Sequence, residues 1–423
     1  MVVSGRPIMR SPAPPLHAGR GRMHRNVLFL AVSQALANTT QGVLLSIVAL
    51  VGNALAEDKA LSTLPHAIQW LGVMAAAVPV SMMMRRLGRR PAFMVGALFG
   101  TAAALIAAFA VARGSFWLFT GALFMFGWFS AVAQHYRFAA AEAADETFRS
   151  RAISLVIGGG VVAAFIGPQI AKWTHVLLVP EYLATLLALA VVPLTLLLAL
   201  PWIVMPKPAA ARRTDAEQGR PMREIATQPA FVVAVLAAVI GWGAMVLMMA
   251  STPIAMEGHG HHFEDAAFVI QWHIFGMYAP GFFTGWLIAR FGVINVLLAG
   301  LGLMALAAVN GLLGTDVVNF WVANICVGAG WNFLFVGATT LLTYTYAPAE
   351  RAKAQGVNDF LVFGFVAFFS FASGWLQTGY GWAVVMYTMF PLIAAVFCAV
   401  LWLRLSPGAQ PAAIRGSGAA LAE

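Results

Sequence analysis

The chain has 423 residues, of which 61% are hydrophobic and only 10% are charged, and its mean hydropathy is +0.82. These values lie far outside the range of soluble globular proteins and indicate an integral membrane protein. The net charge of +9 does not indicate nucleic-acid binding, which would require basic residues interleaved with base-stacking aromatics on a soluble face.

Stretches of about twenty residues pass almost without charge, which is the length that a bilayer-spanning helix requires. We count twelve and predict an all-α integral membrane protein whose twelve transmembrane helices form two six-helix bundles. The spans begin near Val27, Thr63, Ala92, Phe116, Ile153, Tyr182, Phe231, Ala266, Val293, Phe320, Val357 and Ala383. The predicted order is a basic tail (1–26), a first bundle (27–205), a polar linker (206–229), a second bundle (230–404) and a second tail (405–423).

Lysine and arginine positions predict the orientation, because short basic loops stay in the cytoplasm. The N-terminal tail carries five arginines, and Arg85, Arg86, Arg89 and Arg90 follow the second span. With both termini inside, all 25 basic residues except Lys59, Arg113 and Lys172 fall on the cytoplasmic side.

Two pairs of residues at four-residue spacing stand out in consecutive spans, Met245 with Met249 and His273 with Met277. Residues four apart share one helical face. If the two spans are antiparallel, Met245 lies at the depth of Met277 and Met249 at the depth of His273, because the residue-number sums are equal. Thioether and imidazole ligands suit a soft metal such as Cu(I). With 19 methionines, however, about one Met-x-x-x-Met pair is expected by chance.

The loop after the seventh predicted span carries three further histidines, His259, His261 and His262, among acidic residues. This composition could collect metal at the mouth of a transport path. It is equally typical of an ordinary solvated hairpin, and a histidine cluster would also take Cu(II) or Zn²⁺.

The two halves repeat each other. Arg86-Leu87-Gly88 after the second span recurs as Arg290-Phe291-Gly292, and two repeated halves suggest alternating access with a substrate near the midplane. The stretch from Ser81 to Pro91 resembles the loop signature of the major facilitator superfamily. Gly285, Leu287, Arg290 and Gly292 resemble its second copy. The glycine-rich fifth span, from Gly158 to Pro168, is similar to the flexible gating helix of these transporters.

The chain departs from the superfamily signature at its acidic position, which is Arg85 in the first copy and Ala289 in the second. The gating loops are therefore expected to use Arg85, Arg86, Gly88, Arg89, Arg90, Arg290 and Gly292 without the usual ion pair. Arg85 is expected to find another contact, for example Glu142.

The methionine and histidine pairs further resemble a narrower group, the CcoA-type copper importers that supply cytochrome oxidase assembly. Met245, Met249, His273 and Met277 match that group's positions on the seventh and eighth helices. The resemblance implies import of copper, as Cu(I) or a small copper complex, across the bacterial cytoplasmic membrane. Copper would be the transported substrate, no resident cofactor is expected, and a copper chaperone is a candidate partner for a monomeric carrier.

Two alternatives stay open. The same part of the superfamily resembles riboflavin carriers, and Trp70, Trp128, Trp242, Trp272 and Trp331 could stack on a flat ring. A membrane sensor that binds copper without moving it is the other. An enzyme is not expected, because the sequence has no nucleophile and base pairing, Gly-rich phosphate loop or cysteine-based metal signature.

Polar groups within spans are costly and often functional, although hydrogen bonding between helices also explains them. The candidates for lining a path are Gln34, Asn38, His66, Gln69, His135, Asn332 and Asp359. Asp359 is the best acidic candidate for ion coupling, but it lies near the inner end of its predicted span. The sequence therefore gives no firm support for proton coupling.

Overall fold

The computed structural model describes the chain except residues 1–15, 137–138, 141–148, 203–218, 348–349 and 412–423. Ten helices in the described part are individually long and apolar enough to cross a membrane. Helix α6 and the consecutive pair α10–α11 complete an arrangement of twelve spans, which confirms the predicted fold class.

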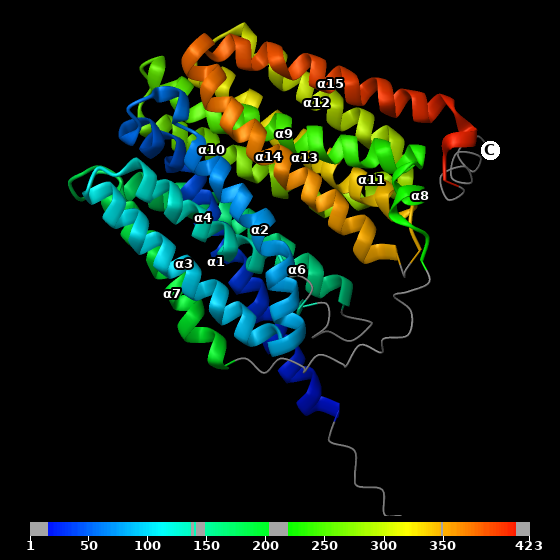
Figure 1. Cartoon of the computed structure of the whole chain (residues 1–423), viewed down its shortest axis with the longest axis horizontal. Helices are drawn as coiled ribbons and strands as arrows, with labels where there is room; N and C mark the ends of the chain where they lie inside the picture. Colours follow the sequence, from blue (N-terminus) through cyan, green and yellow to red (C-terminus); the bar gives the residue numbers. More distant parts are fainter. Residues whose placement is uncertain (1–15, 137–138, 141–148, 203–218, 348–349, 412–423) are drawn as a thin grey trace, which may run out of the picture.

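The first half contains six long helices, which lie at the lower left of Figure 1. They are α1 (Leu16–Leu55), α2 (Leu64–Leu87), α3 (Arg89–Ala112), α4 (Phe116–Ala133), α6 (Arg149–Thr174) and α7 (Leu183–Ala199). Two short 3₁₀ turns belong to this set: η1 (Lys59–Leu61) lies between α1 and α2, and η2 (Leu200–Trp202) follows α7. Helix α1 begins before the predicted start near Val27, so part of the predicted tail is helical.

The second half lies at the upper right of Figure 1 and follows a short helix, α8 (Met222–Ala226). Its helices are α9 (Pro229–Gly258), α10 (Phe263–Tyr278), α11 (Gly281–Phe291), α12 (Val293–Leu313), α13 (Val317–Thr343), α14 (Arg351–Tyr380) and α15 (Trp382–Leu405). A last 3₁₀ turn, η4 (Pro407–Ala409), ends the described chain.

The sequence repeat corresponds to a repeated turn. Gly88 alone joins α2 to α3 with φ 90° and ψ 169°, and Gly292 alone joins α11 to α12 with φ 82° and ψ 152°. Only glycine adopts this region without strain, because a side chain would clash with the backbone. The glycine in each copy of the loop signature is thus required by a one-residue connection between two spans.

The eighth span is broken at Pro280 into α10 and α11, and a neighbouring amide satisfies the groups that the break frees. Asn332 of α13 donates to the carbonyl oxygen of Met277 at 2.7 Å and accepts from the Thr284 hydroxyl at 2.7 Å. Such compensation is what allows proline within a membrane helix. Asn332, predicted as a path-lining candidate, has this structural role.

The helices alternate in direction, so each loop lies at one of two ends of the molecule. We call the end that carries Arg86, Arg290 and Arg351 the basic end. The opposite end carries Lys59, Arg113 and Lys172, and we call it the far end. The halves pack on each other chiefly through α2 with α14 and through α6 with α10.

At the far end α2 is tied to α14 by side-chain and backbone hydrogen bonds. The Thr63 hydroxyl accepts from the Gly374 N–H at 3.0 Å and donates to the Phe371 carbonyl oxygen at 3.3 Å. One helical turn further in, the Ser370 hydroxyl lies 3.1 Å from His66 Nδ1. A Cβ atom at Gly374 would collide with the Thr63 hydroxyl, so the approach requires glycine.

The second contact between the halves, α6 with α10, is also polar at the far end. The Gln169 amide donates to the Gln271 Oε1 atom at 2.9 Å. The Lys172 ammonium lies 3.1 Å from the Glu264 carboxylate, but both groups are partly exposed, so this ion pair contributes little stability. The far ends of the two halves are therefore closed on each other.

The contact between α2 and α14 loosens towards the basic end. Gly364 of α14 still lies close to Met74 of α2: a Cβ atom added to Gly364 would be 3.6 Å from the Met74 sulfur. Val78 and Phe360 lie one helical turn beyond these residues on the same faces, yet they are 66% and 61% exposed. The two facing surfaces are therefore tightly packed only in their far halves.

The end of the linker is fixed to the second half by one carboxylate. Glu350, which precedes α14, accepts from the Arg220 side chain through both oxygens, at 2.9 and 2.8 Å, and from the Arg220 backbone at 2.8 Å. It also accepts from the Ala347 N–H at 2.9 Å. The Arg220 side chain holds the pKa of Glu350 at about 2, well below its ordinary range.

Candidate functional site

Five aromatic rings gather where the two halves meet, and we call them the aromatic cluster. Trp70 comes from α2 of the first half, whereas Trp242, Trp331, Phe335 and Phe363 come from α9, α13 and α14 of the second. Trp242 is the hub, because its ring meets each of the other four nearly edge-on with centroid distances between 5.2 and 5.6 Å. Such edge-to-face contacts are a favoured aromatic geometry.

The remaining four rings form two parallel pairs. Trp70 stacks on Phe363 with centroids 5.8 Å apart and planes 11° apart. Trp331 stacks on Phe335 at 5.1 Å and 5°. The first pair joins the two halves, and the second lies within α13 at four-residue spacing. The cluster thus places large aromatic surfaces where the two halves meet.

The cluster also contains hydrogen-bond donors. Within the described part of the chain, the indole N–H groups of Trp242 and Trp331 are buried and have no hydrogen-bond partner. Their residues expose only 9% and 6% of their surface. A buried donor without an acceptor is costly, so these groups are suited to a ligand that brings a carbonyl oxygen.

Trp70 differs from the other tryptophans in the cluster because its indole donor is paired. Its Nε1–H donates to His66 Nε2 at 3.2 Å, one helical turn earlier on α2. Since an indole only donates, His66 Nε2 must be the unprotonated nitrogen and Nδ1 must carry the hydrogen. His66 Nδ1 therefore donates to Ser370 on α14, and one histidine joins the aromatic cluster to the far-end closure.

A pair of glutamines joins α1 to α2 at the turn of α2 that carries Trp70. Gln69 of α2 donates to Gln41 of α1 at 3.0 Å. Among the described residues, the remaining amide atoms of the pair, Gln41 Nε2 and Gln69 Oε1, are buried and lack partners. They could bind hydroxyl groups on a ligand.

The other two tryptophans of the sequence prediction lie elsewhere. Trp272 meets Phe165 of α6 at 6.1 Å and Trp321 of α13 at 5.9 Å, so it belongs to a second aromatic group at the α6–α10 contact. Trp128 stacks on Phe99 at 5.3 Å and 19° within the first half. It packs α4 against α3.

The predicted metal ligands Met245, Met249, His273 and Met277 are all buried on α9 and α10, which contact each other. His273 turns towards α13, where its Nδ1 lies 2.9 Å from the Asn324 carbonyl oxygen. Its Nε2 is buried and has no partner among the described residues.

The loop histidines are engaged separately. His259 Nδ1 lies 2.7 Å from the Ala255 carbonyl oxygen, and His261 Nε2 lies 2.7 Å from that of Thr315. His262 caps α10 together with Asp265. In the described residues no three side chains of His, Cys, Asp or Glu are placed to hold one metal ion.

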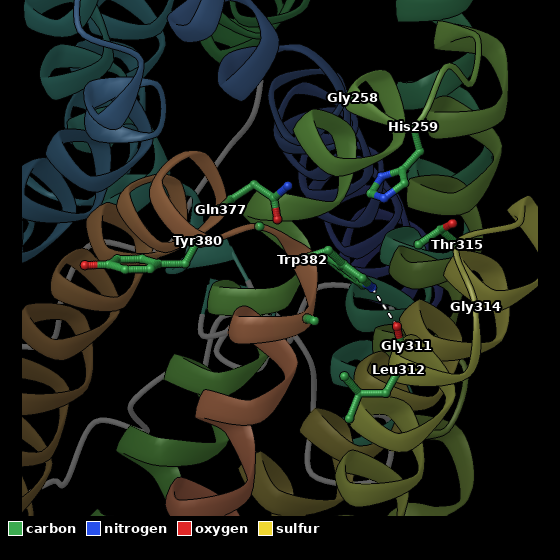
Figure 2. Close-up of a pocket in the computed structure, with 11 residues that line it drawn as sticks. Gly258, His259, Gly311, Leu312, Gly314, Thr315, Gln377, Tyr380 and Trp382 are labelled. Atoms are coloured by element: carbon green, nitrogen blue, oxygen red, sulfur yellow. Dashed lines mark hydrogen bonds between the residues drawn. The ribbon is translucent and has the colours of Figure 1, made fainter.

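His259 also lines a surface pocket at the far end of the second half, between the ends of α9, α12 and α14 (Figure 2). The Trp382 indole closes one side by donating to the Gly311 carbonyl oxygen at 2.8 Å. The lining residues all come from the second half.

The predicted gating residues lie at the basic end. Arg86 and Arg290 are exposed, and Arg89 and Arg90 are partly buried next to Gly88. The side chain of Arg85 and the whole of Glu142 lie outside the described residues, so their predicted contact does too. Asp359 is exposed near the start of α14, accepts from the Asn358 amide at 3.1 Å, and precedes Phe363 of the aromatic cluster by one helical turn.

Comparison with known proteins settles the family. Residues 28–280 match the model of the Major Facilitator Superfamily. The chain belongs to this superfamily. It is thus a multi-pass membrane transporter, as the repeated loop signature predicted.

Three relatives match over most of the chain. The chain is 42% identical over 388 residues to the riboflavin transporter RfnT of Brucella anthropi, covering 90% of this chain and 96% of the relative. It is 26% identical to two uncharacterized superfamily transporters of Bacillus subtilis. YdeG matches over 80% of this chain and 82% of its own length, and YddS over 89% of each.

The prediction of copper import is wrong. The similarity to a riboflavin transporter over nearly the full length supports a carrier of a small organic molecule instead. Methionine is a flexible apolar residue that fills gaps in membrane helices, and one Met pair at helical spacing was expected by chance. The pairs on α9 and α10 therefore had an ordinary explanation as packing.

Phe335, Phe363 and Ser370 were missed by the sequence analysis. Phe335 follows Trp331 by four residues, and Trp70 follows His66 by four. Residues four apart share a helical face, so the sequence could have predicted both of these contacts. Phe363 and Ser370 had none, because they meet α2 only through the contact between the halves.

Proposed function

We propose that this protein carries riboflavin, or a flavin with the same ring system, and that the aromatic cluster binds the ring. The observation that carries the proposal is the 42% identity to a riboflavin transporter over 90% of the chain. The relatedness supports the substrate class, and the chemistry of the cluster supplies a binding site for it.

A flavin matches the cluster in shape and polarity. Its three fused rings are flat and apolar on both faces, and stacking on tryptophan or phenylalanine contributes about 1 kcal/mol beyond area burial. One edge of the ring system carries two carbonyl oxygens, which the unpaired N–H groups of Trp242 and Trp331 could bind. The hydroxyl-bearing side chain of riboflavin would find polar partners in Gln41 and Gln69.

We place the protein in a bacterial cytoplasmic membrane with both termini in the cytoplasm, on the strength of its basic loops. The basic end is then cytoplasmic and the far end faces outwards. Uptake would require the far-end closure to open, admit the flavin to the cluster, and close behind it, as alternating access requires.

The proposal is tested by uptake of radiolabelled riboflavin into a bacterial strain that depends on external riboflavin. We expect uptake above that of the empty vector, competition by unlabelled riboflavin, and none by copper. Trp242→Ala should abolish uptake, whereas Trp128→Phe should leave it near wild type, because the ring of Trp128 stacks on Phe99 of the first half. Uptake no higher than the vector, with the protein present in the membrane, would overturn the proposal.

A further inference from the structure

His66 occupies an unusual position for a histidine within a membrane. It is only 3% exposed, and its two nitrogens bond to different halves of the protein. Nε2 accepts from Trp70 on its own helix at 3.2 Å, and Nδ1 faces Ser370 of α14 at 3.1 Å. The same ring therefore orients a member of the aromatic cluster and holds the far end closed.

This arrangement requires the neutral form of the imidazole. Protonation would place a hydrogen on Nε2, opposite the Trp70 N–H, so two donors would face each other and that bond would be lost. The bond from Nδ1 to Ser370 could persist, but it would hold a charge in a site that is almost fully buried. A buried charge without a partner of opposite sign is strongly unfavourable.

In the part of the chain that the structure describes, no carboxylate on the elements around His66 bonds to its ring. The helices that pack on α2 are α1, α3, α4 and α14, and η1 lies beside its start. Helix α4 and the part of α1 beyond Asn26 contain no titratable side chain. Helix α3 has Arg89 and Arg90 at the basic end. Helix α14 has Arg351, Lys353 and Asp359 at the basic end and Tyr380 at the far end. The turn η1 has Lys59, and α9, whose Trp242 contacts Trp70, has Glu257 in its last turn.

Lys59 of η1 is the charged residue nearest in sequence to the start of α2. Its ammonium is already bound by the backbone carbonyl oxygens of Asn53 and Ala56. Lys59 is itself a cation, so it offers no compensation for a charged imidazole, and Glu57 and Asp58, which precede it, are exposed at the far end.

We propose that His66 is a proton-binding site that couples the far-end closure to the aromatic cluster. Neutral His66 holds α2 to α14 and orients Trp70. A proton taken up on Nε2 breaks the bond to Trp70 and drives the ring towards water, which it reaches when the far ends separate. By linkage, acid favours the far-open arrangement and neutral pH the closed one.

The test measures far-end opening without any substrate, so its outcome is independent of the proposal that the protein carries riboflavin. Ser62 is fully buried beside the Gly374 approach, and Ser62→Cys introduces a thiol there in a background with Cys326→Ala and Cys398→Ala. The rate of labelling by a membrane-impermeant maleimide is measured on purified protein in nanodiscs between about pH 8 and about pH 5, across the range in which imidazole titrates. Because maleimide reacts with the thiolate, each rate is divided by that of Leu177→Cys, which is exposed at the same end.

We expect the normalised rate to rise severalfold in acid. His66→Gln cannot take up a proton but keeps an acceptor for Trp70, so its rate should stay constant with pH. Ser370→Ala, which removes only the partner on α14, should raise the rate at neutral pH and reduce the acid response. A rate that does not rise in acid, or an unchanged acid response in His66→Gln, would overturn the proposal. If His66→Gln does not fold, Ser370→Ala decides instead: a higher neutral-pH rate together with a smaller rise in acid supports the proposal, and an acid response equal to that of the wild type overturns it.

Discussion

Trp70 and Phe363 stack with their planes 11° apart although they belong to opposite halves of the transporter. The pair exists only while α2 and α14 are in contact, so separation of the halves at this point must break it. The ring faces that we assign to the flavin thus depend on the same helix contact that closes the far end. Binding of a flat ring between them and closure around it would be one event.

Substitutions of Trp242 should separate the stacking role from the hydrogen-bonding role. Trp242→Phe keeps a ring at the hub of the cluster but removes the unpaired N–H, and we expect riboflavin affinity to fall about fivefold, since one hydrogen bond contributes roughly 1 kcal/mol. Trp242→Ala should lose binding altogether. Equal affinity of Trp242→Phe and wild type, measured by titration of the purified proteins, would show that the indole N–H does not contact the substrate.

Enlarging Gly374 should weaken the far-end closure. A methyl group there collides with the Thr63 hydroxyl, so Gly374→Ala should raise maleimide labelling of Ser62→Cys severalfold at neutral pH. The double variant Gly374→Ala with Thr63→Ala makes room for the methyl group and should restore part of the closure. If Gly374→Ala labels as slowly as its parent, the contact does not limit opening.

The pairing of Arg220 with Glu350 should stabilise the junction of linker and second half in a pH-dependent way. The pKa of Glu350 is lowered to about 2, so the stabilisation is complete above the ordinary carboxyl range and is lost as pH falls through the lowered value. Arg220→Gln should reduce the thermal midpoint at pH 7 and flatten its decline in acid. Arg220→Lys keeps the charge but cannot bond to both carboxylate oxygens in the same bidentate way, so its thermal midpoint should be intermediate. If the midpoints of Arg220→Gln and wild type fall equally in acid, the ion pair does not stabilise this junction.

The methionine pairs should be replaceable. Met245→Leu together with Met249→Leu conserves volume in a buried site and should cost less than about 1.5 kcal/mol per site. We therefore expect riboflavin uptake within about twofold of wild type. Loss of uptake in a variant that still reaches the membrane would indicate that the thioethers contact the substrate after all.

The fold followed from the sequence because its signals are local. Apolar length gave the twelve spans, and Gly88 and Gly292 marked the same one-residue turn in each half. The break at Pro280 was harder to place. A proline alone does not show whether a membrane helix continues, and here the outcome depends on Asn332 of another helix.

The candidate site was harder to predict from the sequence, because its residues come together only when the two halves pack on each other. Trp70, Trp242 and Trp331 were candidates from composition, but the partners Phe363 and Ser370 lie about 300 residues from α2 along the chain. The pairs built from Met245, Met249, His273 and Met277 were misleading for a related reason. Spacing on one helix shows which residues share a face, whereas it does not show whether that face binds a ligand.

The most direct test of a flavin site in the aromatic cluster is a titration of riboflavin with purified protein, followed by flavin fluorescence. Stacking on tryptophan quenches that fluorescence, so we predict saturable quenching by the wild-type protein. The quenching should be retained in Trp128→Phe and lost in a variant that combines Trp70→Ala with Phe363→Ala. Absence of saturable quenching by the folded wild-type protein, or undiminished binding by the double variant, would contradict a flavin site in the cluster.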